Sequence, residues 1–141
     1  MPCYTADMAP NTVYLHWTPA DEFMLSDNDD HRIPMKKPKG VKPSDLLSMA
    51  LIGCSSYDVV EILQKQRQNL QELRVTAEST QDTTPPWRFR KIHIRYQAVG
   101  RDIDVEKLRK AVQISEEKYC SVYATLKDAI EITHEVEVVE G

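Results

Sequence analysis

The chain has 141 residues, of which 41% are hydrophobic and 28% charged; this is the size and composition of one soluble globular domain, and it argues against disorder. A net charge of −4 makes a nucleic-acid partner unfavourable. We find no apolar run of the ~20 residues that a membrane span needs and no signal-peptide pattern at the start, so we expect a soluble, cytoplasmic protein.

Residues 1–40 are predicted to form a β-meander. Apolar and polar residues alternate around Leu15, and apolar residues return around Leu25, which is typical of strands with one buried face. The short polar side chains of residues 26–30 favour a turn, because they can bond to their own backbone. A brief third strand is expected near Ile33.

Residues 44–70 carry the strongest helical signal in the chain and include the first of two central cysteines. Ser44 suits an N-cap, and Asp45 suits the positive end of the helix dipole. The first half, up to Cys54, is apolar nearly all round, whereas the second half is amphipathic. A small domain rarely encloses a helix by itself, so the apolar half indicates a homodimer whose second subunit supplies the other wall.

Residues 71–141 are predicted to alternate between strands and helices. A period of two predicts strands near 73–78 and 92–98, with a bulge or an early register change where Phe89 falls out of phase. Asp104 is expected to cap a helix, and a shorter helix is expected to follow Cys120. The final alternating segment is predicted to be a strand with an acidic face. This order indicates an α+β architecture, which we assign to one domain over residues 1–141.

The cysteines are the candidate reactive groups. The sequence has no Cys-x-x-Cys pair and no two histidines at i, i+4 spacing, which excludes zinc-ribbon, thioredoxin-type and zincin-type sites. Cys54 lies in mid-helix, where a buried apolar role is common. Cys120 lies at the start of a predicted helix, where backbone N–H groups favour a thiolate; a buried cysteine at a turn is the alternative. Two thiols can form a redox pair if their Cα atoms come within ~7 Å.

Two segments resemble the OsmC/Ohr family of organic hydroperoxide resistance proteins. The first runs from Pro43 through Cys54 and on to the sequence Tyr-Asp-Val-Val at residues 57–60. The second covers residues 110–122 and includes the sequence Ser-Glu-Glu-Lys-Tyr-Cys-Ser-Val. The order of predicted elements matches over nearly the whole chain. The resemblance implies an OsmC-like fold, in which a strongly bent β-sheet wraps over a long central helix, and an intertwined homodimer.

The resemblance also implies a thiol-based peroxidase of the oxidative stress response. Cys54 would attack an organic hydroperoxide and become a sulfenic acid, and Cys120 would resolve it to a disulfide that a thiol or dithiol then reduces. No metal or organic cofactor is implied. We expect Met49, Leu51 and Tyr57 to form an apolar substrate pocket, which suits a hydrophobic peroxide.

The chain departs from the peroxidase members of that family at two positions, which keeps other functions open. Those members have a glutamate ten positions before the first cysteine, where this chain has Ser44, and an activating arginine in the N-terminal strands, a region whose one arginine here is Arg32. One alternative is a binding or carrier protein that uses an apolar dimer cleft and has weak or no peroxidase activity. Another is a metal bound by the two cysteines and His134. Cys3 is expected to be incidental.

Overall fold

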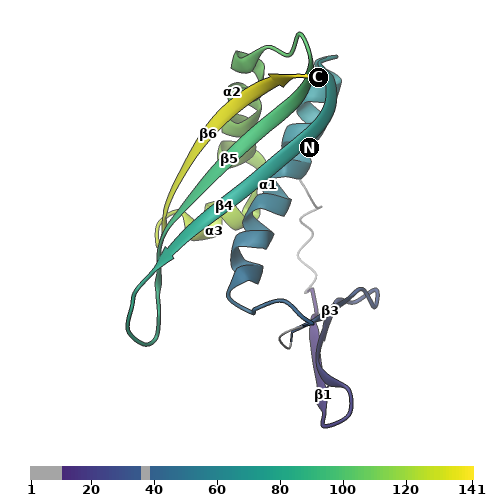
Figure 1. Ribbon diagram of the computed structural model, residues 1–141, viewed down its shortest axis with the longest axis vertical. Coiled ribbons are helices and arrows are strands. Elements are labelled where there is room, and N and C mark those ends of the chain that lie inside the picture. The colour runs from purple at the N-terminus through teal and green to yellow at the C-terminus, as the bar shows by residue number, and fades with distance from the viewer. Residues whose placement is uncertain (1–10, 36–38) are drawn as a thin grey trace. The chain divides into compact units, whose positions relative to one another are not determined.

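The structure is a computed structural model, and it describes residues 11–35 and 39–141. Cys3 and the first part of the predicted meander lie outside these residues. The elements follow one another as β1 (Tyr14–Thr18), β2 (Glu22–Ser26), β3 (Arg32–Pro34), α1 (Asp45–Lys65), β4 (Asn69–Gln81), β5 (Phe89–Arg101), α2 (Val105–Ile114), the π-helical turn η1 (Ser115–Tyr119), α3 (Ser121–Leu126) and β6 (Glu131–Glu140) (Figure 1). The predicted α+β class and long central helix are confirmed. The strands form two three-stranded sheets, one on each side of α1 in the sequence.

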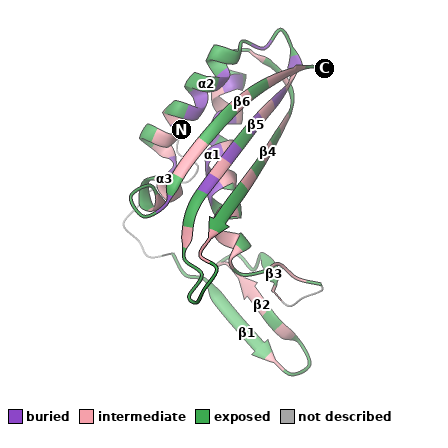
Figure 2. Ribbon diagram, turned by 60° about the vertical axis from the view of Figure 1, so that its left-hand side comes forward, coloured by how far each residue is buried: buried purple, intermediate pink, exposed green. Residues whose placement is uncertain are grey.

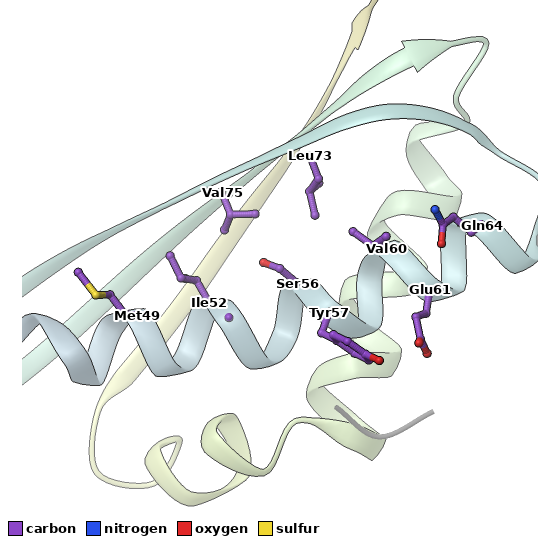
Figure 3. Close-up of a pocket in the computed structure, with 10 residues that line it drawn as sticks. Met49, Ile52, Ser56, Tyr57, Val60, Glu61, Gln64, Leu73 and Val75 are labelled. Carbon is purple, nitrogen blue, oxygen red and sulfur yellow. The ribbon is translucent and has the colours of Figure 1, made fainter. Parts of the chain in front are cut away.

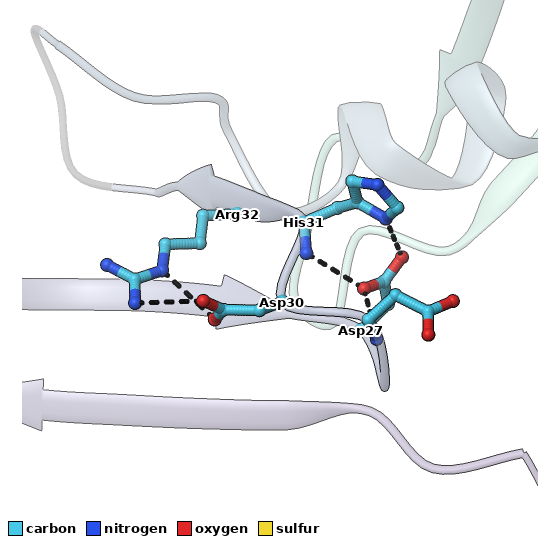
Figure 4. A network of polar contacts seen from close by, with 5 residues as sticks. Asp27, Asp30, His31 and Arg32 are labelled. Carbon is cyan, nitrogen blue, oxygen red and sulfur yellow. Dashed lines mark hydrogen bonds and ion pairs between the residues drawn. The ribbon is translucent and has the colours of Figure 1, made fainter.

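The N-terminal sheet is the predicted meander, in which β1 pairs with β2 and β2 with β3, both antiparallel. Its predicted turn is held by Asp27, whose Oδ1 accepts from the N–H groups of Asp29 and His31, each at 2.9 Å. The other oxygen of Asp27 lies 2.7 Å from Nδ1 of His31, and Asp30 pairs with Arg32 at 3.1 Å (Figure 4). The short acidic side chains therefore organise this turn as the sequence predicts.

Helix α1 ends at Lys65, five residues before the predicted end at residue 70. Arg67 adopts a left-handed φ of 57°, and the N–H groups of Arg67 and Gln68 donate to the carbonyls of Gln64 and Leu63, both at 3.0 Å. This pair of bonds is a Schellman motif, which closes a helix and usually has glycine at the left-handed position. Because arginine occupies that position, the sequence carries no recognisable stop signal, and the predicted helix extends into β4.

The second sheet has the order β4-β5-β6, with β4 antiparallel and β6 parallel to β5. A parallel neighbour requires a crossover connection, and α2, η1 and α3 provide it. The predicted bulge is confirmed by a register shift between Thr80 and Gln81, opposite Phe89. Helices α1, α2 and α3 lie on one face of this sheet (Figure 1). Alternate residues of β5 from Ile92 to Ala98 are buried (Figure 2).

Residues 48–141 form one compact unit, and the described residues that precede them belong to another. Within the larger unit, Leu51, Val59 and Leu63 of α1 are completely buried. The other side of the helix is open, with Met49 46% and Tyr57 53% exposed. The single chain thus encloses the first half of α1 on one side, whereas its composition predicts burial all round.

Helix α1 also corrects the expectation that no segment has the length and apolar character of a membrane span. Its 21 residues include an 18-residue window with a mean hydropathy of 1.5, which is enough to cross a membrane by length and composition. The core helix of a water-exposed domain meets the same criterion. Here the completely buried polar residue Asp58 lies within the helix, and it faces a hydrogen-bonding side chain of η1.

Candidate functional site

The two central cysteines are both buried in the larger unit. Cys54 lies in the middle of α1 and is 8% exposed, and Cys120 precedes α3 and is 2% exposed. Cys54 takes part in a disulfide bond, whereas Cys120 is a free thiol, so the two are not bonded to each other in this structure. The positions match the sequence predictions of a mid-helix cysteine and a cysteine at a helix start.

Cys120 is held by the backbone on both sides. Its N–H donates to the carbonyl of Ser115 at 2.8 Å, and its Sγ accepts from the N–H of Tyr123 at 3.3 Å as the N-cap of α3. Burial raises the pKa of the Cys120 thiol, while the N–H groups at the start of α3 lower it. The charged groups of the described residues that act on this thiol, Asp58 and Glu116, are both acidic and raise its pKa further. Cys120 is therefore favoured as a neutral thiol.

A buried polar cluster of Ser55, Asp58, Tyr96 and Ser115 joins α1 to β5 and η1. Each of the four is at most 1% exposed. The hydroxyls of Ser55 and Tyr96 share a hydrogen bond of 2.7 Å, and the Ser115 hydroxyl donates to Oδ2 of Asp58 at 2.8 Å. Two short contacts thus connect the central helix to the strand and to the segment that leads to the second cysteine.

Asp58 is the residue of this cluster whose burial is least favourable. Its Oδ1 is buried and has no hydrogen-bond partner within the part of the chain that the structure describes. Removing a carboxylate from water disfavours its charged form. Burial therefore raises the pKa of Asp58. The hydrogen bond from Ser115 and the charge of the N-terminal amino group oppose that effect, and the charge on Glu61 adds to it.

The cluster brings the segment of Cys120 onto the helix that carries Cys54. Ser115 accepts from the N–H of Cys120 through its carbonyl, and its hydroxyl lies 3.5 Å from the carbonyl oxygen of Ser55, the residue after Cys54. Asp58 and Ser115 are site residues that the sequence alone did not predict. The available signal was an acidic residue among the apolar positions of α1, four residues after the cysteine.

An open pocket of about 670 Å³ lies on the opposite edge of α1 (Figure 3). Its lining residues come from α1 and β4: Met49, Ile52, Gly53, Ser56, Tyr57, Val60, Glu61, Gln64, Leu73 and Val75. Met49 and Tyr57 line this pocket, and their role in binding a substrate stays a prediction. Leu51 is not in the lining, because it is completely buried in the core.

Cys54 lies at the boundary between this pocket and the buried polar cluster. At about 100° per residue, its side chain leaves the helix about 60° from Tyr57 on the pocket side and about 40° from Asp58 on the buried side. Cys54 itself is not among the lining residues. It is thus positioned between an apolar surface and a buried carboxyl group.

The other candidates from the sequence have local partners. Nδ1 of His134 lies 2.9 Å from Oε1 of Glu116, and its ring makes an edge contact with Tyr96 at a centroid distance of 6.3 Å. Arg32 pairs with Asp30 within the N-terminal sheet. Over residues 11–35 and 39–141, no group of three or more His, Cys, Asp or Glu side chains is arranged to hold a metal ion.

Comparison with known proteins identifies the relatives of this chain. The family described as "OsmC-like protein" matches residues 36–135. Protein YhfA of Escherichia coli K12 is 37% identical over 126 residues, which cover 87% of this chain and 94% of YhfA. Its name states no activity.

Solved structures share the fold over nearly their whole length. A hypothetical protein from Aquifex aeolicus VF5 has a TM-score of 0.84 and 29% identity, and the match covers 95% of this chain and 99% of that one. An organic hydroperoxide resistance protein OsmC from Legionella pneumophila has a TM-score of 0.65 over 95% of this chain and 100% of that one. At 13% identity, this second likeness shows the fold alone.

Proposed function

The chain belongs to the OsmC-like protein family, and on this basis we propose that it is a thiol-dependent reductase of organic hydroperoxides that acts in the response to oxidative stress. Proteins of the same fold carry the name organic hydroperoxide resistance protein, in Legionella pneumophila and in Bacillus subtilis. The proposed reacting groups are the thiols of Cys54 and Cys120.

The reaction balances with two thiols and no cofactor. The Cys54 thiolate attacks the terminal oxygen of the hydroperoxide, the O–O bond breaks, and the alkoxide takes up a proton and leaves as an alcohol. Cys54 is then a sulfenic acid. The Cys120 thiol attacks its sulfur, a disulfide forms, and water leaves. A dithiol reductant returns both cysteines to thiols by exchange.

The observation that carries this proposal is the linkage through Ser115. Its carbonyl accepts from the N–H of Cys120 at 2.8 Å, and its hydroxyl lies 3.5 Å from the carbonyl of Ser55, next to Cys54. A resolving thiol has to reach the sulfenic acid without unfolding the helix, and this linkage supports such an approach. Burial and the acidic neighbours of Cys120 disfavour its thiolate, so we assign the attack on the peroxide to Cys54 rather than to Cys120.

A homodimer is part of the proposal. Met49 and Tyr57 are about half exposed on the open side of α1, beside the apolar residues of the pocket. A second copy of the chain would cover this side and convert the open pocket into an enclosed apolar site for a hydrophobic peroxide. We also infer a cytoplasmic location, since a cycle that depends on thiol reductants suits a reducing compartment.

The test is the Cys54-dependent consumption of cumene hydroperoxide with dithiothreitol as reductant. We expect Cys54→Ser to abolish turnover. Cys120→Ser should leave a sulfenic acid on Cys54 that dimedone traps and mass spectrometry detects. Equal turnover by the wild type and Cys54→Ser would eliminate the proposed activity.

A binding or carrier function is the second candidate, and the pocket favours it. The cavity is lined mainly by apolar side chains, and neither proposed reactive cysteine is among them. Native mass spectrometry of the purified protein tests this function. A hydrophobic ligand that co-purifies with the wild type, together with a Cys54 thiol that titrates above neutral pH, would favour it. Rapid peroxide turnover by protein without ligand would count against it.

A further inference from the structure

We propose that Asp58 is the general acid that delivers a proton to the alkoxide leaving group when Cys54 attacks a hydroperoxide. This inference rests on the proposed function and adds a catalytic residue to it. An alkoxide is a poor leaving group in a buried site, because its charge develops away from water. A positioned acid removes that obstacle and contributes about 10²–10⁴ in rate in enzymes that use one.

The placement of Asp58 on α1 supports this role. Residues four apart lie on the same face of a helix, so Asp58 lies one turn beyond Cys54. Both side chains are buried. Because Cys54 lies between Tyr57 of the pocket and Asp58 of the cluster, a peroxide that enters from the pocket would meet the sulfur with the carboxyl group beyond it.

The carboxyl group is oriented, and one of its oxygens is available. The hydroxyl of Ser115 donates to Oδ2 at 2.8 Å, which leaves Oδ1 buried and without a partner among the described residues. A completely buried polar atom without a partner is rare in proteins and calls for an explanation. A bound reaction partner that accepts a hydrogen bond from Oδ1 explains it.

The burial of Asp58 favours its protonated form. Burial is the largest influence, and it raises the pKa of this carboxyl group. The hydrogen bond from Ser115 and the positive charge of the chain's N-terminal amino group lower this pKa, and the charge of Glu61 raises it, but burial outweighs the groups that lower it. A carboxyl group in such a setting keeps its proton at higher pH than one in water and can donate it.

The proton balance closes over one cycle. When the disulfide is reduced, the thiol proton of Cys54 passes to the Asp58 carboxylate, which produces a thiolate and a carboxylic acid. The thiolate attacks the terminal oxygen, the O–O bond breaks, and the acid transfers its proton to the alkoxide. An alcohol leaves, Cys54 is a sulfenic acid, and Asp58 is a carboxylate again. The dithiol supplies the electrons.

Two oxidants with different leaving groups test the proposal. Reduction of tert-butyl hydroperoxide expels an alkoxide that needs a proton, whereas reduction of peracetic acid expels acetate, which is stable as an anion. We expect Asp58→Asn to slow Cys54 oxidation by tert-butyl hydroperoxide about 100-fold and by peracetic acid less than about threefold. Stopped-flow measurement of both rates on the reduced full-length protein gives the ratio.

Two further variants keep the result interpretable. Asp82→Asn removes a carboxylate that pairs with Arg90 at 2.9 Å away from this site, and both rates should stay at wild-type values. Ser115→Ala frees the carboxyl group without removing it. If Asp58→Asn does not fold, Ser115→Ala should still slow the alkyl hydroperoxide selectively.

The outcomes separate the two proposals. Equal losses with both oxidants, or no loss with either, would overturn the role of Asp58 while the peroxidase function stands. A wild type that reacts with tert-butyl hydroperoxide no faster than Cys54→Ser does would overturn the peroxidase function itself. Only a selective loss with the alkyl hydroperoxide supports the acid role.

Discussion

The substitution Asp58→Asn should make the folded protein more stable at neutral pH and leave its stability nearly unchanged at acid pH. The reason is the pKa of Asp58, which burial raises above its ordinary value of 3.8. The folded chain therefore binds this proton more tightly than the unfolded chain does. Its free energy of unfolding falls as pH rises from the unfolded pKa through the folded pKa, because ionisation costs more in the folded state. Asparagine has no charge to bury and avoids that loss.

The structure sets the scale of the effect. Oδ1 of Asp58 is buried without a partner, and leaving such a group unsatisfied costs about 1–3 kcal/mol. Each unit by which the folded pKa exceeds the unfolded one corresponds to about 1.4 kcal/mol. The amide can keep the hydrogen bond from Ser115 through its oxygen, although its NH₂ group inherits the unpartnered position. We therefore expect a gain of about 1 kcal/mol at neutral pH.

Urea unfolding at pH 4, 5, 6, 7 and 8, at one protein concentration, measures this effect. The difference in free energy of unfolding between Asp58→Asn and the wild type should be smallest at pH 4 and should grow to a plateau. Asp82→Asn is a control with the opposite dependence on pH. The hydrogen bond from Arg90 lowers the pKa of Asp82, so the ionised Asp82 stabilises the folded chain at neutral pH and this contribution is lost as pH falls. Asp82→Asn should therefore destabilise the protein most at neutral pH. A difference for Asp58→Asn that is constant with pH, or that shrinks as pH rises, would refute the reasoning.

Three further predictions concern packing and capping, and urea unfolding checks each. The hydroxyls of Ser55 and Tyr96 share a buried bond of 2.7 Å, so a double-mutant cycle of Ser55→Ala and Tyr96→Phe should give a coupling of about 1 kcal/mol; additive effects would count against this bond. A Cβ on Gly100 would lie 2.0 Å from the carbonyl oxygen of Asn69, so Gly100→Ala should lower the free energy of unfolding by at least about 2 kcal/mol. A Cβ on Gly53 would have nothing within 4 Å, so Gly53→Ala should leave the free energy of unfolding unchanged or raise it by up to about 1 kcal/mol. Asp104→Ala removes the helix cap that accepts from the N–H of Glu106 at 2.9 Å, so it should lower the free energy of unfolding by about 1 kcal/mol. An unchanged midpoint of urea unfolding would show that this cap is unimportant.

Local patterns predict most of the elements of the fold because the forces behind them are local. The alternation around Leu15 and the short polar side chains after β2 act over a few residues, and both give the expected strand and turn. The cap at Asp104 is likewise visible in the sequence. The end of α1 was not predictable, because it depends on Arg67 in a conformation that glycine usually adopts.

The candidate site could be predicted only in part, because its connections span distant segments. The two cysteine motifs mark Cys54 and Cys120, and the apolar helix and its flank mark Met49 and Tyr57 as pocket residues, but not that both are exposed in the single chain. The placement of Leu51 could not be predicted, because its side of the helix depends on how β5 packs against α1. The hydrogen bond from Ser115 to Asp58 joins residues 57 positions apart, and no local pattern predicts it.

The buried carboxyl group connects the stability of this protein to its proposed chemistry. If the cluster served only to fasten η1 to α1, an asparagine at position 58 would accept the same bond from Ser115 without a charge to bury. A chain whose total stability is about 5–15 kcal/mol would then bury an ionisable group, at a cost of about 1 kcal/mol at neutral pH, for no benefit. Residues kept at such a cost are often part of an active site. Asp58→Asn should therefore gain stability at neutral pH and lose alkyl hydroperoxide reduction together. A variant that gained the stability and kept the activity would show that the carboxyl group has no part in the reaction.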